Sequence, residues 1–361
     1  MGLDAIQSET PEPWTEPIPS ITTACGPEII QVEPDKTYRI RAIGAQALSM
    51  VSFAFEDHDN MSVIAVDAGY VQPAVTDHMQ IGGGQRFDFL LRTKTERELQ
   101  SLGKSMFWIQ LESRYRPINV TSYALLSYKT SPHFNKTVPS SPPADAPLSL
   151  TNEGQDWLEY TLQPLYPNSF PGAQEVSRQV VLTSAQLLAQ SGVFWSVNNR
   201  TWTESNEHLG NTSYSTTKPN VGTPYLVSIF EYGEQAIPDY NTAVQNYGGW
   251  DPTLNVYAAK VGEIIDIILV NEPNGMSGGF DAHPWHIHGA HVYDLGSGPG
   301  IYNSTANEER LSRYNPVLRD TTWLYKYTTG DDVGTDKKYT SQGWRAWRLR
   351  VENPGCVLPF T

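Results

Sequence analysis

Alternation of apolar and polar side chains is the main structural signal in this chain. Residues 38–42, 51–56 and 85–91 alternate with a period of two, which is typical of half-buried β-strands. Residues 63–66 form a continuous apolar run that fits a strand buried on both faces. The pattern predicts an all-β chain rather than a helical bundle.

The succession of predicted strands occurs twice. In the second half, residues 261–270, 286–295 and 344–351 follow one another in the same roles. At one constant offset, the middle elements align Phe53 with His286, Phe55 with His288 and His58 with His291. We expect two β-sandwiches of one kind, with His58 and His291 at matched positions of the scaffold.

Other elements are short or irregular. Residues 96–102 and 184–190 each predict a short helix. Residues 82–84, three glycines before a strand pattern, predict a hairpin turn rather than a phosphate-binding loop. Residues 131–177 are rich in Pro and Ser and predict a linker that lies on a surface. Four of its side chains can pack onto a domain: Trp157, Tyr160, Leu162 and Tyr166.

The strongest chemical signal is the segment His283-Pro284-Trp285-His286-Ile287-His288. On an extended strand, His286 and His288 project to one face and Ile287 to the other. Pro284 biases its predecessor towards extended geometry, so His283 can leave the strand and face a different pocket. Imidazole suits copper, zinc, iron and nickel. The alternative is a histidine-rich loop whose ring nitrogens are all hydrogen-bonded.

Together with residues 289 and 292–296, this segment resembles the third copper-binding motif of multicopper oxidases, the laccase and ascorbate oxidase family. Residues 343–355 resemble the fungal ascorbate-oxidase-like branch of that family. By position, the resemblance implies that His283 is a ligand of the type 1 copper. His286 would bind the type 2 copper and His288 one of the type 3 pair.

The resemblance also implies the architecture, which is two cupredoxin-like Greek-key β-sandwich domains. Residues 1–130 would correspond to the family's second domain, which has no copper ligands. Residues 178–361 would correspond to most of its third domain, with residues 131–177 as the linker.

Part of the family's ligand set has no counterpart in this sequence. The chain holds eight histidines, with no His-x-His pair before His286, whereas the family needs about ten histidines and one cysteine. After Gly355 the family continues to a His-Cys-His motif, and Cys356 comes too early to be the type 1 thiolate. We therefore expect a fragment that lacks the first domain and is inactive by itself.

Charge narrows the range of partners. A formal net charge of −14 argues against a nucleic acid or an anionic membrane, because phosphate binding needs clustered Lys and Arg. No apolar run approaches the roughly 20 residues of a membrane span. The resemblance implies copper as cofactor and, in the complete protein, a small ascorbate-type or phenolic electron donor with O2 as acceptor.

Two cysteines, Cys25 and Cys356, are too few for a disulfide framework, and the resemblance implies that Cys25 bridges to the absent first domain. Residues 1–8 lack the basic and apolar regions of a signal peptide. A secreted glycoprotein is expected from the family and from Asn-x-Ser/Thr sequons. These lie at Asn60, Asn119, Asn135, Asn199, Asn211 and Asn303.

Three hypotheses stay open. The chain is an incomplete oxidase, through truncation or a misassigned gene ending; a non-catalytic copper-binding module; or a structural partner that completes a copper cluster with a separate chain. Beside the third motif, Arg319 and Asp320 are expected to brace a loop through a charge-assisted hydrogen bond.

Overall fold

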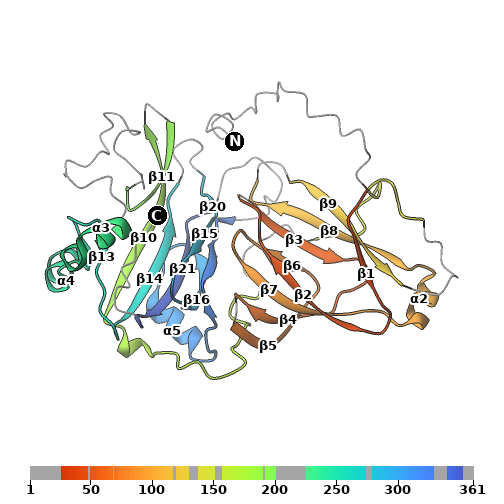
Figure 1. Ribbon diagram of the computed structural model, residues 1–361, viewed down its shortest axis with the longest axis horizontal. Helices are drawn as coiled ribbons and strands as arrows, with labels where there is room; N and C mark the ends of the chain where they lie inside the picture. Colours follow the sequence, from red (N-terminus) through yellow and green to blue (C-terminus); the bar gives the residue numbers. More distant parts are fainter. Residues whose placement is uncertain are drawn as a thin grey trace.

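Two β-sandwiches lie side by side along the long axis of the molecule (Figure 1). The structure is a computed structural model, and several residues named above lie outside the part it describes, namely Cys25, Asn135, Asn211 and Cys356. The described residues are 26–47, 49–67, 69–116, 119–129, 137–150, 157–189, 192–200, 225–273, 279–328 and 340–352.

The first sandwich is built from two sheets. Across one sheet the order is β1 (Ile29–Val32), β9 (Thr121–Tyr128), β8 (Met106–Arg114), β3 (Met50–Phe55) and β6 (Met79–Ile81). Across the other it is β2 (Thr37–Ile43), β7 (Arg86–Arg92), β4 (Met61–Val66) and β5 (Gly69–Thr76). Of these pairs, β1 and β9 run parallel and the others antiparallel.

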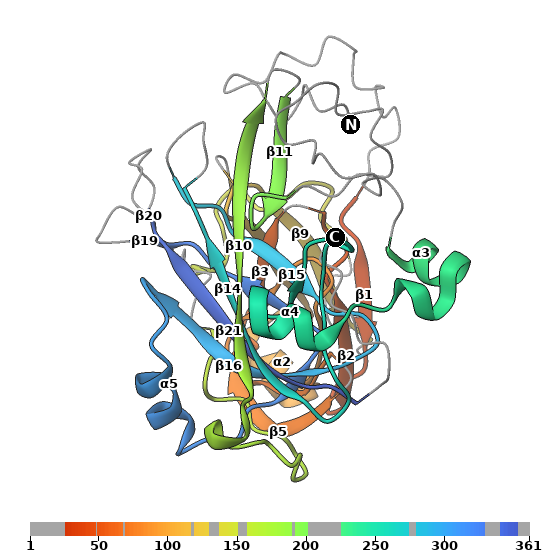
Figure 2. The same cartoon turned by 90° about the vertical axis from the view of Figure 1, so that its left-hand side faces the viewer.

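The second sandwich contains a larger sheet. Its order is β11 (Gly192–Val197), β10 (Arg178–Ala189), β14 (Ile264–Asn271), β21 (Gly343–Arg350), β16 (Val292–Pro299) and β17 (Leu318–Arg319). Three two-stranded sheets accompany it: β15 (His283–His286) with β18 (Thr321–Leu324), β12 (Trp250–Asp251) with β13 (Val256–Tyr257), and β19 (Tyr327–Thr328) with β20 (Thr340–Ser341). The β10–β11 hairpin projects from this sandwich (Figure 2).

The two sandwiches repeat one topology, as the sequence predicts. The order β2-β7-β4-β5 in the first corresponds to β14-β21-β16-β17 in the second. The pair β3–β6 likewise corresponds to β15–β18. Phe53 faces Met79 across the first pair, and His286 faces Thr321 across the second. Both pairs are antiparallel, and the constant offset places Phe53 and His286 at matched positions in them.

Alternation explains why these segments become sheets with a buried face. In β7, Phe87, Phe89 and Leu91 are buried, while the residues between them are partly exposed. They join one apolar core in the first sandwich, and two further cores lie within the second. The predicted all-β class is confirmed.

Helices are few and lie outside the sheets. Among the described residues they are α2 (Glu96–Leu102), α3 (Tyr225–Tyr232), α4 (Tyr240–Tyr247) and α5 (Ser304–Leu311), with 3-10 turns η1 (Ala173–Glu175) and η3 (Gly233–Ala236). The helix α2 has the predicted bounds. The helix predicted at residues 184–190 is wrong, because through residue 189 this stretch belongs to β10, where it pairs with β11, and Ser184 pairs with β14 as well.

The linker packs onto both sandwiches, mostly as predicted. The indole of Trp157 lies 5.4 Å from the ring of Phe87 in the first sandwich, between ring centroids. The hydroxyl of Tyr160 donates to Asn307 Oδ1 in the second sandwich at 3.0 Å, and Leu162 is buried. Tyr166 is 70% exposed, so its predicted packing is wrong.

The three glycines at residues 82–84 lie where the two sandwiches meet. The strands that they connect, β6 and β7, belong to different sheets, so this turn is not the predicted hairpin. A Cβ atom on Gly82 would stand 1.6 Å from Nε1 of Trp323, a side chain of β18 that is 1% exposed. Glycine is therefore needed here for close approach, not for phosphate binding.

Candidate copper site

The three candidate ligands lie on and just after β15. Pro284 does not end the strand, because His283 is inside β15 and faces Leu324 of β18. The prediction that His283 leaves the strand is therefore wrong. It faces away from His286 for a simpler reason: residues three apart in a strand point to opposite faces. Among the described residues β15 pairs only with β18, and an edge strand tolerates proline.

His286 and His288 share one face, as predicted. Their ring centroids are 4.9 Å apart and the rings meet edge to face, with both residues exposed. Ile287 between them is 8% exposed and packs in the core of the second sandwich. Two imidazoles this close can bind one metal ion, or two ions about 3.5–4 Å apart.

Hydrogen bonds fix one nitrogen of His286. Its Nδ1 lies 2.8 Å from the backbone carbonyl of Asp320 and 2.9 Å from Oγ1 of Thr321. A carbonyl can only accept, so Nδ1 carries a proton, and in the neutral form of this ring the lone pair is on Nε2. This is the arrangement in which a metal-binding histidine is held by its other nitrogen.

His283 lies in a different environment. Its ring meets the indole of Trp195, on β11, edge to face with 5.1 Å between centroids. Burial lowers the pKa of His283. The imidazole is therefore neutral near pH 7, which is the form that binds metals. Trp195 is 48% exposed, so this side of the segment borders on solvent.

The structure gives the two scaffold histidines other surroundings. His58 is buried, with Nδ1 2.6 Å from the carbonyl of Glu56 and Nε2 2.7 Å from the hydroxyl of Tyr128. Both of its nitrogens are engaged, as a structural histidine requires. His291 is half exposed, and its Nε2 lies 3.7 Å from Asp320.

Asp320 is the polar centre next to the histidine pair, and it connects the two sandwiches. Arg86 of β7 donates to its carboxylate from both terminal nitrogens, at 2.5 and 2.7 Å. Burial raises the pKa of Asp320, but the hydrogen bonds from Arg86 and Thr321 outweigh it, and the pKa is lowered overall. Charge-assisted hydrogen bonds at Arg319 and Asp320 are present as predicted, since Arg319 Nε donates to Asp67 at 3.1 Å. Both Arg86 and Asp67 lie in the other sandwich, which the sequence did not indicate.

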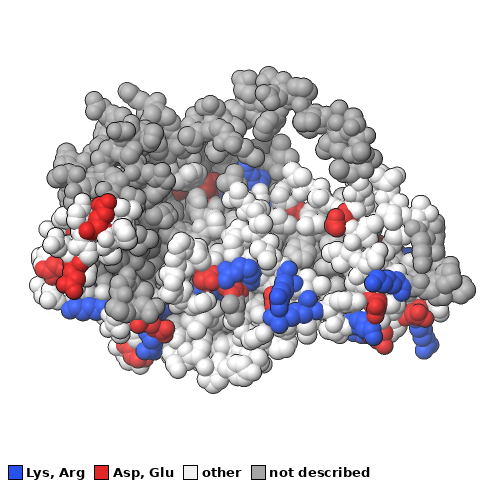
Figure 3. All heavy atoms as spheres, in the orientation of Figure 1, with Lys and Arg blue, Asp and Glu red and all other residues white. Residues whose placement is uncertain are grey.

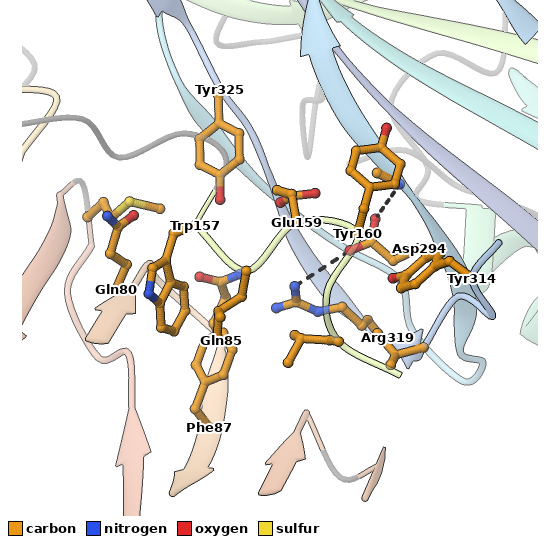
Figure 4. Close-up of a pocket in the computed structure, with 15 residues that line it drawn as sticks. Gln80, Gln85, Phe87, Trp157, Glu159, Tyr160, Asp294, Tyr314, Arg319 and Tyr325 are labelled. Atoms are coloured by element: carbon orange, nitrogen blue, oxygen red, sulfur yellow. Dashed lines mark hydrogen bonds and ion pairs between the residues drawn. The ribbon is translucent and has the colours of Figure 1, made fainter. Parts of the chain in front are cut away.

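A second charged cluster is buried between the sandwiches and the linker. Arg345 of β21 donates to Asp294 of β16 at 2.9 Å and to Glu159 of the linker at 2.6 Å. Figure 4 shows Glu159 and Asp294 close to Arg319 beside a small cavity. The cavity volume is about 20 Å³, room for about one water molecule. It is too small for an organic substrate.

Three features of the described part of the chain limit the kinds of site that it can form. It contains no cluster of three or more His, Cys, Asp or Glu side chains arranged to hold a metal ion. No helix within it has the length and apolar character to cross a membrane. On the face in Figure 3, the described acidic and basic side chains are interspersed rather than gathered into one basic patch.

Comparisons with known proteins agree with the motif. Two family models, each described as multicopper oxidase, match residues 7–131 and 222–330. The chain is 62% identical over 359 residues to multicopper oxidase terE of Aspergillus terreus, covering 99% of this chain and 67% of that protein. It is 42% identical to laccase-like multicopper oxidase 1 of Thermothelomyces thermophilus, covering 93% and 50%. An L-ascorbate oxidase of Cucumis sativus is 28% identical, covering 92% and 51%.

Solved structures confirm the cupredoxin fold of both sandwiches. A laccase from Botrytis aclada matches with a TM-score of 0.61 at 18% identity, covering 91% of this chain and 49% of that one. Fet3p matches with a TM-score of 0.59 at 19% identity, covering 91% and 53%. The chain spans 67% of its Aspergillus terreus relative and about half of the others named here. On the family models and the 62% identity, the chain belongs to the multicopper oxidase family, whose cofactor is copper.

Proposed function

We propose that this chain provides copper ligands to an oxidase that oxidises a small ascorbate-type or phenolic donor and reduces O2 to water. One observation carries the proposal: a single strand presents histidines to two different faces. His286 and His288 lie together on one face with Nε2 of His286 available, and His283 lies on the other beside Trp195. Electron entry and O2 reduction in such an oxidase need two separate centres.

The residues fit copper. All three side chains are imidazoles, which bind copper well, and a carbonyl orients His286 through Nδ1. Bound copper would supply one-electron oxidation of the donor and reduction of O2. In this proposal His283 is the type 1 ligand, His286 the type 2 ligand and His288 a type 3 ligand. The exposed indole of Trp195 offers the donor an apolar surface next to His283.

The proposed domain division is 1–130 and 178–361, joined by the linker at 131–177. A first domain would be the partner that supplies the remaining cluster ligands, and the complete protein would be extracellular. The described sequons suit that location, since Asn60, Asn119 and Asn303 are exposed.

Copper titration by calorimetry tests the proposal on the full chain. Replacement of His286 or His288 by Ala is expected to weaken Cu(II) binding at least about tenfold. His291→Ala is the matched control, since its ring is equally exposed and near the same carboxylate. Equal losses in all three variants, or none in the first two, would overturn the ligand assignment. The copper-loaded chain is expected to consume no O2 with ascorbate; steady consumption would show that no further domain is needed.

A further inference from the structure

Two crossed ion pairs join the sandwiches beside the histidine pair. Arg86, from the first sandwich, binds the Asp320 carboxylate with two nearly parallel hydrogen bonds. In the opposite sense, Nε of Arg319 in the second sandwich donates to Asp67 in the first at 3.1 Å. Arg86 also donates to the backbone carbonyl of Asp67 at 3.0 Å. We call these four residues the crossed clasp.

Hydrogen bonds connect the crossed clasp to the imidazole of His286. The hydroxyl of Thr321 donates its hydrogen to Asp320 Oδ1 at 2.9 Å. The same hydroxyl oxygen can therefore only accept from Nδ1 of His286. The backbone N–H of Thr321 donates to Asp67 Oδ2 at 3.3 Å. Residues 320 and 321 are therefore fixed by side chains of the other sandwich, and both acceptors of His286 Nδ1–H belong to them.

A competing acceptor lies close by. Oδ1 of Asp320 is 3.6 Å from Nδ1 of His286, and Oδ2 is 3.7 Å from Nε2 of His291. With Arg86 in place, both carboxylate oxygens already accept short hydrogen bonds from a guanidinium. Without Arg86, the carboxylate and the backbone beside it would be free to move, so the carbonyl would no longer hold the Nδ1–H of His286 and the ring could turn either nitrogen towards the carboxylate.

We propose that Arg86, in the sandwich without copper histidines, is a positioning residue for His286. By holding Asp320, it keeps the Nδ1–H of His286 on the backbone carbonyl and presents Nε2 outward. The consequence for copper rests on the proposed function; the consequence for the ring does not. The first sandwich would thus act on the metal site without contributing a ligand.

The test uses the full, metal-free chain and the nitrogen chemical shifts of the His286 ring. Wild type is expected to show a single Nδ1-protonated tautomer, and Arg86→Gln a mixture. Arg41→Gln is the control, because Arg41 is also a strand arginine but its side chain is 70% exposed and only 3.8 Å from Asp88. If Arg86→Gln keeps the wild-type tautomer while folded, the proposal is overturned.

Two more measurements separate the possible failures. Arg86→Lys keeps the charge but cannot form two parallel hydrogen bonds, so it is expected to change the tautomer of His286 less than Arg86→Gln does. If Arg86→Gln does not fold, the tautomer is measured in Arg86→Lys instead. Cu(II) titration is expected to give about tenfold weaker binding for Arg86→Gln. If His286→Ala leaves copper binding unchanged, the ligand assignment fails, yet the tautomer still decides the role of Arg86.

Discussion

Replacement of Gly82 by Ala tests the contact between the sandwiches. The added Cβ would stand 1.6, 1.9 and 2.5 Å from three atoms of the Trp323 indole. Carbon atoms in ordinary contact are about 3.5–4 Å apart, so the indole or the turn must move by about 2 Å. Gly82 does not have the left-handed φ that favours glycine, so the effect would be purely steric.

Trp323 has little room to yield. It is 1% exposed and belongs to an apolar cluster with Met50, Tyr325 and Tyr327, and the ring of Tyr115 stacks on it at 6.2 Å. Overpacking of a filled core costs about 1–3 kcal/mol, and a shift this large belongs near the upper value. We expect the free energy of unfolding to fall by about 3 kcal/mol, roughly a hundredfold in the unfolding equilibrium.

Urea unfolding, followed by tryptophan fluorescence, measures the loss. Gly26→Ala is the control, since no atom lies within 4 Å of its Cβ position. Trp323→Leu removes the indole, so Gly82→Ala should cost less than about 1 kcal/mol in that background. An equal cost of Gly82→Ala with and without the indole would refute the steric explanation.

Three further outcomes are expected. Arg345→Met should lower the free energy of unfolding by about 3–5 kcal/mol, because it leaves the buried Glu159 carboxylate without its guanidinium and leaves Asp294 with only Arg319, 3.6 Å away; a urea unfolding loss below about 1 kcal/mol would contradict this. Burial raises the pKa of Glu263, but the hydrogen bond from Arg178 at 2.7 Å lowers it below the ordinary value overall. The stabilisation of the fold by ionised Glu263 should be complete above about pH 4.3 and lost as the pH falls through the folded pKa. The urea midpoint of wild type should therefore fall more between about pH 5 and about pH 3 than the midpoint of Glu263→Gln. Equal falls in the two proteins would contradict this prediction. Thr95→Ala removes the capping box of α2 and should destabilise that helix by about 1 kcal/mol, which would be measured as faster amide hydrogen exchange in the helix. Unchanged exchange would show that the capping box does not stabilise α2.

Strands were predictable wherever side chains alternate between the core and the outside. The patterns at residues 38–42 and 85–91 became β2 and β7, since half-buried strands carry that period. The prediction for residues 184–190 was wrong because Ala, Leu and Gln favour helices in isolation. Pairing of residues 184–189 with β11, and of Ser184 with β14, overrode that preference, and no local pattern records this pairing. The helix α4 did have a signal, the cap at Asp239 and the terminal Gly248, which the sequence analysis did not use.

The candidate site was predictable in its ligands but not in its supports. Strand alternation was sufficient to place His286 and His288 together and Ile287 in the core. Arg86 could not be linked to Asp320, because 234 residues separate them and only the docking of two sandwiches brings them together. The same holds for Asp67 and Arg319, which are 252 residues apart.

The linker does more than connect the sandwiches, because its residues 157–162 fill the seam between them. Trp157 packs on the first sandwich, while Glu159 and Tyr160 bond to the second. A protease cut at the exposed residues 140–142 should therefore leave two pieces that stay together without a peptide bond between them. The gene should tolerate division at this point into two coexpressed polypeptides, the second of which would begin with its own docking peptide.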